Sequence, residues 1–408
     1  MKILNFGSCN IDVVYSLDHI VNIGETETTH SLDTFPGGKG LNQSIALARA
    51  GASVYHAGCV GEDGSMLTDV LKESGVDVSY MKKVPAKNGH AIIQVSARGE
   101  NSIFLYPGSN EMISEEYIDE VLNDFSKGDI ILLQNEINNI SYIIDIAYER
   151  GMQIVLNPSP FNEKVINIDL NKISYLILNE IEAKNYCGYE DPERIILYFT
   201  ENYPKLNVML TLGTNGCVFA NSEIKVFHPI FEVNAVDTTA AGDTFTGYFI
   251  EGVSRGDCYE DILKIASAAS AISVSRNGAA PSIPLRSETI ELMRSMTVKN
   301  KDNREELIKR INTYLRNNLC NLSLRGLAEE LKYSSVYTGK LIKQLTGMCY
   351  SDYVHNLRCQ VAAELLRNTG MSVNEVIASI GYENGSFFRK KFKEKYGKNP
   401  HDYRKNYV

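Results

Sequence analysis

The sequence predicts an α/β fold built on a doubly wound sheet, followed by an all-α domain with two helix-turn-helix units. In residues 1–297, short apolar runs alternate with amphipathic helical stretches, which is typical of buried parallel strands covered by helices. Residues 12–35 and 88–107 instead alternate apolar and polar side chains, which predicts a small sheet with one exposed face. Beyond residue 303 only helical periodicity remains.

The apolar runs give the strands of the main sheet in chain order. Four of the clearest lie at residues 130–133, 154–156, 175–178 and 208–212. Helical patterns lie between them, for example at residues 140–150 and 192–202. This alternation predicts that each buried strand is followed by a helix that covers the sheet.

A polar stretch at residues 297–303 has no apolar period and indicates a linker, so the expected parts are 1–297, 298–303 and 304–408. The net charge of −9 combines −18 on the first 298 residues with +9 on residues 299–408. An acidic body with a basic tail suggests two partners of different charge. The alternative is that the tail docks on the body.

The composition is that of an ordinary globular protein, with 44% hydrophobic and 22% charged residues among 408. The first residues carry one lysine and a short apolar run broken by Asn10 and Asp12, so no signal peptide is expected. The sequence contains no run of about 18 apolar residues, so no membrane span is expected. The eight cysteines form no C-x-x-C pair, which favours reduced thiols and a cytoplasmic location.

Asp243 is the leading candidate for a catalytic base. It follows an apolar strand that ends near Val236, and a helix is expected to begin near Ala240, Ala241 and Gly242. Small residues let a phosphate approach the free N–H groups at a helix start, where the helix dipole is positive. Asp243 in the first turn could then accept a proton from a hydroxyl. The alternative is a carboxylate that only satisfies the helix dipole.

Three further segments have residue types that suit phosphoryl transfer. Residues 37–42, Gly-Gly-Lys-Gly-Leu-Asn, precede an alanine-rich helix without forming a Walker loop. Asn179 and Glu182 follow a strand and could steer Mg²⁺ or its waters, or simply cap a helix. Residues 211–216 form a glycine-bearing turn after another strand, which is either a connector or a nucleotide-facing loop.

Together these segments resemble the ribokinase, or PfkB-type, carbohydrate kinase family across nearly all of residues 1–297. The resemblance is carried by residues 7–12, 37–42, 134–136, 157–158, 179–182, 211–216, 237–245 and 278–282. It implies a ribokinase-like fold and an ATP-dependent kinase for a ribose-like sugar that uses Mg²⁺ and K⁺. It also implies that the small sheet is a lid over the sugar, which often pairs between the subunits of a homodimer.

The resemblance gives individual residues their roles. Asp243 is implied as the base, with the amides of Ala240, Ala241, Gly242 and Asp243 forming an anion hole. The residues implied to bind sugar are Asn10, Asp12, Gly38, Lys39, Gly40, Asn42, Glu136 and Asp243. Those implied to face ATP are Asn179, Thr211, Gly213, Thr214, Gly216, Gly242 and Ser267. Glu182 would act on Mg²⁺ through water. The potassium loop would comprise Asp237, Thr239, Ser273, Arg276, Gly278 and Ser282, largely through backbone carbonyls.

Two positions depart from the family pattern. Ser267 stands where ribokinases often carry His near the adenine, and Leu178 replaces a common Pro. Neither removes a catalytic group, so both bear on the fit of the nucleotide. Asp243 is retained, which favours a working kinase over a domain kept only as a sensor.

The basic tail contains two similar units. Residues 324–347 and 373–397 each indicate a helix, a short turn and a second helix, with Gly381 at the turn of the second unit. Two such units in a basic domain suggest recognition helices that enter successive major grooves of double-stranded DNA. The alternatives are plain helical hairpins and, for the basic run at 389–391, a solvated helix face.

Residues 304–403 resemble the AraC/XylS DNA-binding domain. The resemblance is carried by residues 327–328, 333–334, 341–347, 358–366, 380–388, 392–393 and 397–404. The residues implied to face bases are Val336, Gly339, Lys340, Gly385, Ser386 and Lys390. Those better placed for phosphates are Lys343, Arg389, Lys391 and Lys393. The two glycines offer no side chain to read a base.

Two hypotheses follow from these resemblances. The first is a sugar-responsive transcriptional regulator that retains kinase chemistry, and the second is a transcription factor whose kinase fold is an idle sugar sensor. A protein-interaction tail is disfavoured by the paired helix-turn-helix pattern and the +9 charge. Ribose is the leading sugar, although fructose-type, deoxyribose and nucleoside substrates share this frame.

Overall fold

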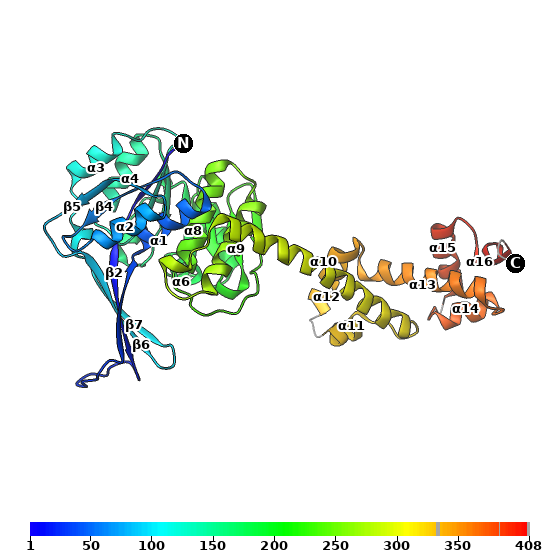
Figure 1. Cartoon of the computed structure of the whole chain (residues 1–408). Coiled ribbons are helices and arrows are strands. Elements are labelled where there is room, and N and C mark those ends of the chain that lie inside the picture. The colour runs from blue at the N-terminus through cyan, green and yellow to red at the C-terminus, as the bar shows by residue number, and fades with distance from the viewer. Residues whose placement is uncertain (332–334, 383, 406–408) are drawn as a thin grey trace. The chain divides into compact units, whose positions relative to one another are not determined.

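The computed structural model describes residues 1–331, 335–382 and 384–405, without the side chains of residues 296–306, 336, 337, 340 and 344. The chain forms two compact units, Met1–Met293 and Arg294–Val408 (Figure 1). All eight cysteines are free. Within the described ranges, no helix combines the length and the apolar character needed to cross a membrane.

The first unit is built on a sheet whose nine described strands run in the order β13-β12-β11-β10-β9-β8-β1-β4-β5. They are β1 (Ile3–Phe6), β4 (Val54–Val60), β5 (Asp77–Lys83), β8 (Ile130–Gln134), β9 (Gln153–Asn157), β10 (Tyr175–Asn179), β11 (Asn207–Thr211), β12 (Cys217–Ala220) and β13 (Lys225–His228). The seven neighbouring strands β11, β10, β9, β8, β1, β4 and β5 pair in parallel. The strands β12 and β13 add an antiparallel edge. The expected doubly wound sheet is confirmed.

Helices cover both faces of this sheet because its strands send alternate side chains into two apolar layers. In β1, Ile3 joins one layer and Leu4 the other. The layer with Ile3 contains α1 (Lys39–Ala50), α2 (Ser65–Glu73), α8 (Ala241–Arg255) and α9 (Tyr259–Val274). The layer with Leu4 contains α3 (Glu115–Leu122), α4 (Ile140–Glu149), α5 (Glu163–Ile166), α6 (Glu180–Cys187) and α7 (Pro192–Asn202).

A smaller sheet projects from this body, as Figure 1 shows for β2, β6 and β7. Its described strands run in the order β3 (Ser31–Gly37), β2 (Asn10–Leu17), β6 (Gly89–Ser96) and β7 (Asn101–Tyr106). Apolar side chains that are about half exposed lie on it: Leu32, Phe35, Ile103, Phe104, Leu105 and Tyr106. The half-exposed sheet expected at residues 12–35 and 88–107 is therefore present, and it begins beside Asn10.

The polar stretch at residues 298–303 lies inside a helix, α10 (Arg286–Asn317), and the division between the compact units falls earlier, after Met293. The linker expected there stays a prediction, because a helix can itself connect two units. No Gly or Pro occurs between residues 286 and 317, so nothing in the sequence interrupts the helix.

The second unit is helical throughout its described part, as expected. Its helices after α10 are α11 (Leu324–Leu331), α12 (Ser335–Thr346), α13 (Tyr350–Asn368), α14 (Val373–Ser379), α15 (Gly385–Tyr396) and α16 (Pro400–Lys405). The pairs α11/α12 and α14/α15 form the two helix-turn-helix units, each with its own apolar core. Gly381 has φ +76° in the second turn, and a Cβ there would lie 2.6 Å from the Leu319 carbonyl oxygen.

Candidate active site and helix-turn-helix units

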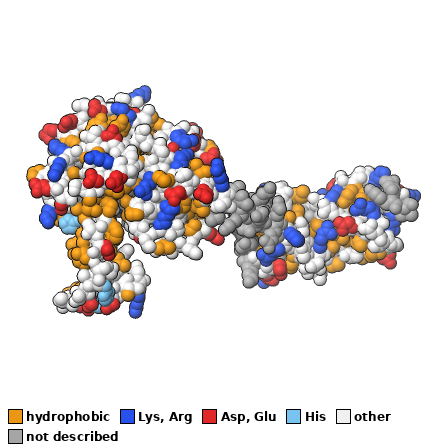
Figure 2. Space-filling model, viewed as in Figure 1, with side chains coloured by type: hydrophobic (Ala, Val, Ile, Leu, Met, Phe, Trp, Pro, Cys, Tyr) orange, Lys and Arg blue, Asp and Glu red, His pale blue; other side chains and the backbone are white. Residues whose placement is uncertain are grey.

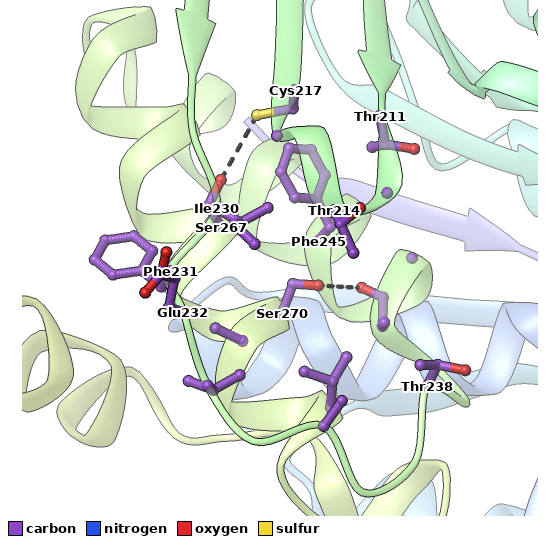
Figure 3. Close-up of a pocket in the computed structure, with 18 residues that line it drawn as sticks. Thr211, Thr214, Cys217, Ile230, Phe231, Glu232, Thr238, Phe245, Ser267 and Ser270 are labelled. Carbon is purple, nitrogen blue, oxygen red and sulfur yellow. Dashed lines mark hydrogen bonds between the residues drawn. The ribbon is translucent and has the colours of Figure 1, made fainter. Parts of the chain in front are cut away.

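Two adjoining cavities open at the carboxyl end of the main sheet, and both are lined by Thr211, Thr238 and Gly242. The larger has a volume of about 460 Å³ and is mostly apolar; Figure 3 shows the side chains that line it. The smaller, about 250 Å³, is polar and contains Lys39 and Asp243. The predicted nucleotide residues that line the larger cavity are Thr211, Gly213, Thr214, Gly216, Gly242 and Ser267, whereas Asn179 lines the smaller one.

The wall of the larger cavity that includes Ser267 is made by α8, α9 and β12. Ser267 lies 3.6 Å from the thiol of Cys217 (Oγ to Sγ), and Ser270 donates a hydrogen bond to the Ala241 carbonyl at 3.1 Å (Figure 3). Phe245 and Val274 supply apolar surface beside them. Such a mixture of flat apolar walls and a few hydroxyls suits a purine base.

Asp243 lies in the first turn of α8, as predicted, and is almost fully buried. Ala240 caps the helix with φ +60°, and a Cβ added at Gly242 would meet no atom within 4 Å, so the helix start is open to the cavities. Of the amides expected to form the anion hole, that of Ala241 already donates to the Thr238 carbonyl at 3.3 Å. Gly242 and Asp243 therefore supply the first-turn N–H groups that face the smaller cavity.

The Asp243 carboxylate does more than satisfy a helix dipole, because two amide side chains from α1 hold it. Asn42 Nδ2 donates to Oδ2 at 3.1 Å, and Gln43 Nε2 donates to Oδ1 at 2.9 Å. The side-chain oxygen of Asn42, Oδ1, is buried and has no partner among the described residues. It is therefore an acceptor that a hydroxyl of a bound molecule could satisfy.

The glycine loop before α1 brings the predicted sugar residues together. Glu136 Oε2 accepts hydrogen bonds from Ser8 Oγ at 2.5 Å and from the Lys39 amide at 3.0 Å. A Cβ at Gly40 would lie 2.4 Å from the Ser8 nitrogen, and Gly38 has φ +95°, so this loop requires glycine at both positions.

Asp12 and Asn10 lie where the small sheet leaves the body. The Asp12 carboxylate rests against Gly37, where a Cβ would lie 2.0 Å from Oδ2. Asn10 Oδ1 accepts a hydrogen bond from Asn110 at 2.7 Å. Both predicted residues therefore border the loop that carries Lys39.

The site concentrates negative charge around one lysine. Burial, followed by repulsion from Glu136 and Asp243, raises the pKa of Asp12 to about 7. Burial also raises the pKa of Glu136 despite attraction to Lys39. Burial works against the ammonium of Lys39, but Asp243, Glu136 and Glu182 raise its pKa overall. A neutral molecule rich in hydroxyls suits these groups better than an anion does.

Asn179 and Glu182 form a capping box at the start of α6, so the cap that the sequence offered as an alternative is present. The Glu182 amide donates to Asn179 Oδ1 at 2.8 Å, and the Asn179 amide donates to Glu182 Oε2 at 3.0 Å. Both residues also line the smaller cavity, where Glu182 is buried. Capping thus fixes a carboxylate at the cavity wall, which fits a role in holding Mg²⁺-bound water.

Asp237 brings together the segments of the predicted potassium loop. Its Oδ1 accepts from the Thr239 amide and its Oδ2 from the Gly278 amide, both at 2.9 Å. Burial opposes the charged form, but these hydrogen bonds leave the pKa of Asp237 below its ordinary value. Ser273 and Ser282 meet nearby, with their hydroxyl oxygens 2.9 Å apart.

Arg276 belongs to the same loop but turns its side chain to Glu288, with which it forms an ion pair at 2.5 Å. Carbonyl, hydroxyl and carboxylate oxygens are the ligands that K⁺ and other hard cations prefer, and the loop is rich in them. The arrangement fits a monovalent cation held by backbone carbonyls, with Arg276 contributing only its main chain.

Sequence reasoning missed three polar residues that the structure places at the site: Gln43, Asn110 and Asn157. One available signal was strand position. Gln134, Asn157, Asn179 and Thr211 end the neighbouring parallel strands β8 to β11, with Gln134 paired to Asn157 and Asn179 paired to Thr211. The carboxyl ends of parallel strands share one edge, so all four belong to the same site.

Four of the predicted DNA-facing residues of α15 are exposed, namely Ser386, Arg389, Lys390 and Lys393, whereas Gly385 and Lys391 are half-buried. Ser386 and Lys390 face solvent, while Arg389 donates to Asn374 Oδ1 at 2.9 Å and Lys391 pairs with Glu394 at 3.2 Å. Figure 2 shows Lys and Arg side chains spread over the visible face of this unit. In α12, Gly339 is half-buried and Lys343 is exposed; the side chains of Val336 and Lys340 lie outside the described residues.

Known proteins resemble both units. Residues 1–286 match the pfkB family of carbohydrate kinases, and residues 327–406 match a helix-turn-helix domain. The ribokinase of Haemophilus influenzae is 34% identical over 297 residues, covering 70% of this chain and 96% of that protein. The ribokinase of Bacillus subtilis is 35% identical over 292 residues, covering 70% and 97%.

Solved structures agree with these relatives. Ribokinase from Thermotoga maritima gives a TM-score of 0.65 at 34% identity, covering 72% of this chain and 99% of that chain. Arabidopsis thaliana ribokinase complexed with ribose and ATP gives 0.63 at 27% identity, covering 72% and 98%. The resemblances to a ribokinase-type kinase and to an AraC-type helix-turn-helix domain are thereby confirmed.

Proposed function

The chain belongs to the pfkB family of carbohydrate kinases, and we propose that its first unit transfers the terminal phosphoryl group of ATP to a hydroxyl of a ribose-like sugar. The observation that carries this proposal is the placement of Asp243. It is a buried carboxylate at an open helix start, in the polar cavity that adjoins the larger cavity beside Thr211 and Gly242.

The residues present define a direct transfer. Lys39, Asn42 and Asp12 bind the sugar hydroxyls. Asp243 accepts the proton of the reacting hydroxyl while the oxygen of that hydroxyl forms the new P–O bond. The N–H groups of Gly242 and Asp243 stabilise the charge that gathers on the transferring group as its bond to ADP breaks. ATP supplies the phosphoryl group. Glu182 would hold Mg²⁺ through water, and that ion would neutralise phosphate charge. The Asp237 loop would hold K⁺, which would steady the helix start.

We further propose that the second unit binds double-stranded DNA, so that the chain is a sugar-responsive transcriptional regulator with a working kinase. The paired helix-turn-helix units and the exposed Lys343, Ser386 and Lys390 support this. The half-exposed apolar side chains of the small sheet, such as Phe104, support a lid that pairs in a homodimer. A dimer would present two DNA-binding units to one site.

The experiment that tests the proposal is a coupled assay of the full chain with ATP, Mg²⁺ and K⁺ against ribose, deoxyribose, fructose and nucleosides. ADP production with one of these sugars is the expected result. Sugar binding by calorimetry without any turnover would leave the second hypothesis, a catalytically idle sugar sensor. DNA binding is read separately, as retention of duplex fragments that weakens with added salt.

A further inference from the structure

A chain of buried carboxamide side chains lies behind Asp243. Gln43 Nε2 donates both to Asp243 Oδ1 at 2.9 Å and to Asn157 Oδ1 at 3.0 Å. Gln134 Nε2 donates to Gln43 Oε1 at 2.7 Å and to Asn5 Oδ1 at 2.9 Å. Asn5, Gln43 and Gln134 have no exposed surface, and none of the four carboxamides is assigned to a substrate.

Backbone carbonyls at both ends fix the direction of every amide in this chain. Asn5 Nδ2 donates to the Gly40 carbonyl at 2.7 Å, and a carbonyl can only accept. Asn5 Oδ1 must then face Gln134 Nε2, and Gln134 Nε2 must face Gln43 Oε1. At the other end, Asn157 Nδ2 donates to the Ile177 carbonyl at 3.0 Å, which turns Asn157 Oδ1 toward Gln43.

Gln43 therefore has no freedom to present its oxygen to Asp243. Its oxygen is taken by Gln134, and its two N–H bonds go to Asn157 and Asp243. The fixed orientation of these amides leaves one buried acceptor unpaired, because Gln134 Oε1 has no partner among the described residues. Gly7 accommodates that oxygen, because a Cβ there would lie 2.5 Å from it. A buried acceptor is left unpaired so that the direction of the chain is kept.

No member of this chain titrates, so it can orient Asp243 without removing the proton that Asp243 receives. The ionisable groups Lys39, Glu136 and Asp12 interact electrostatically with Asp243, and Lys39 lines the smaller cavity with it. The Gly40 carbonyl also belongs to the glycine loop that carries Lys39. The chain thus ties the position of the proposed base to the backbone of the proposed sugar loop.

We propose that Gln43 is a positioning residue that holds Asp243 as an oriented carboxylate, anchored through Gln134 and Asn5 to the Gly40 carbonyl. This inference rests on the proposed kinase function, and it assigns to Gln43 a contribution to kcat without contact with either substrate. A donor to the carboxylate favours its charged, proton-accepting form. Loss of that donor leaves the Asp243 carboxylate free to turn away from the reacting hydroxyl.

The test uses the full chain and four variants. Gln43→Met keeps the length of the side chain without its donor. Gln134→Met removes the next amide in the hydrogen-bonded series, one hydrogen bond further from Asp243. Asn207→Leu is the matched control, because Asn207 donates to the Ser174 carbonyl at the opposite, amino-terminal edge of the sheet. Gln43→Glu, which keeps the shape, replaces Gln43→Met in the same assays if the latter does not fold.

We expect Gln43→Met to lower kcat by about 10- to 100-fold, with the KM values for sugar and ATP within about threefold. Gln134→Met should lower kcat by less, and Asn207→Leu should leave kcat and the KM values unchanged at a similar loss of Tm. An unchanged kcat in the folded Gln43 variant, or a fall in kcat that merely follows Tm across all variants, would overturn the inference.

A second readout does not depend on turnover. In a double-mutant cycle, Gln43→Met should lower Tm by at least about 2 °C more in the parent chain than in an Asp243→Ala background. Absence of turnover in the parent chain with every sugar would refute the proposed function, and the cycle would still decide whether Gln43 holds Asp243. Additive Tm changes would overturn the inference in either case.

Discussion

The candidate active site and the DNA-facing helices of the second unit are built in opposite ways. Asp243 is buried and held by Asn42 and Gln43, and Gln43 is itself held by Asn157 and Gln134. Ser386 and Lys390 on α15 are exposed. The first site is assembled before any ligand arrives, whereas the second presents side chains that gain partners only on binding.

The difference follows from what each partner supplies. Proton transfer needs a base aligned to within a fraction of an ångström, so buried hydrogen bonds hold the Asp243 carboxylate in one orientation. A DNA backbone supplies many equivalent phosphates, so separate exposed lysines each add a small, salt-dependent contribution. Single changes should therefore have large effects in the first unit and small, additive effects in the second.

The largest expected effect is that of Asp243→Asn. The variant keeps the shape of the side chain but removes the proton acceptor, so kcat should fall by about 1,000-fold. Sugar binding measured by calorimetry should change little, because the Lys39 and Asp12 contacts remain. Duplex binding in the absence of sugar should be unchanged, since Asp243 belongs to the other unit. A kcat within tenfold of the parent would show that another group is the base.

The strand ends and the helix start of this site were predictable from sequence, because each is marked locally. Asn179 and Thr211 end apolar runs, and Gly242 precedes an amphipathic helix. The bond between Gln43 and Asp243 was not predictable, because the two residues are 200 positions apart and Gln43 lies in an ordinary helical pattern. The helical state of residues 298–303 was likewise not evident from the pattern, because this stretch has no apolar period although nothing there breaks a helix.

A smaller effect is expected from Asp12, and it depends on pH. Because burial raises its pKa in the folded protein to about 7, the neutral form stabilises the fold below the unfolded-state pKa. That stability is lost as the pH rises through about 7. Between pH 5 and pH 8 the parent chain should lose up to about 3 kcal/mol more unfolding free energy than Asp12→Asn.

Denaturant unfolding at several pH values measures this difference. Asp33→Asn, at an exposed position of β3, is the control and should behave like the parent. Sugar binding should show the reverse trend, with KM falling as the pH rises through about 7, because hydroxyls donate to the charged carboxylate. Parallel pH profiles for the parent and Asp12→Asn would mean that Asp12 is charged throughout.

The smallest effects are expected on α12 and α15, where exposed lysines act one at a time. Lys343→Ala should weaken binding to every duplex by about 3- to 10-fold and reduce the slope of log affinity against log salt by about one, since it removes one phosphate contact. Lys390→Ala should instead reduce the preference for a selected site over random duplex. Lys72→Ala, on α2 of the first unit, should change neither quantity. If Lys343→Ala and Lys390→Ala altered site preference equally, Lys390 would be no different from a lysine that contacts phosphate, and its role in reading bases would be refuted.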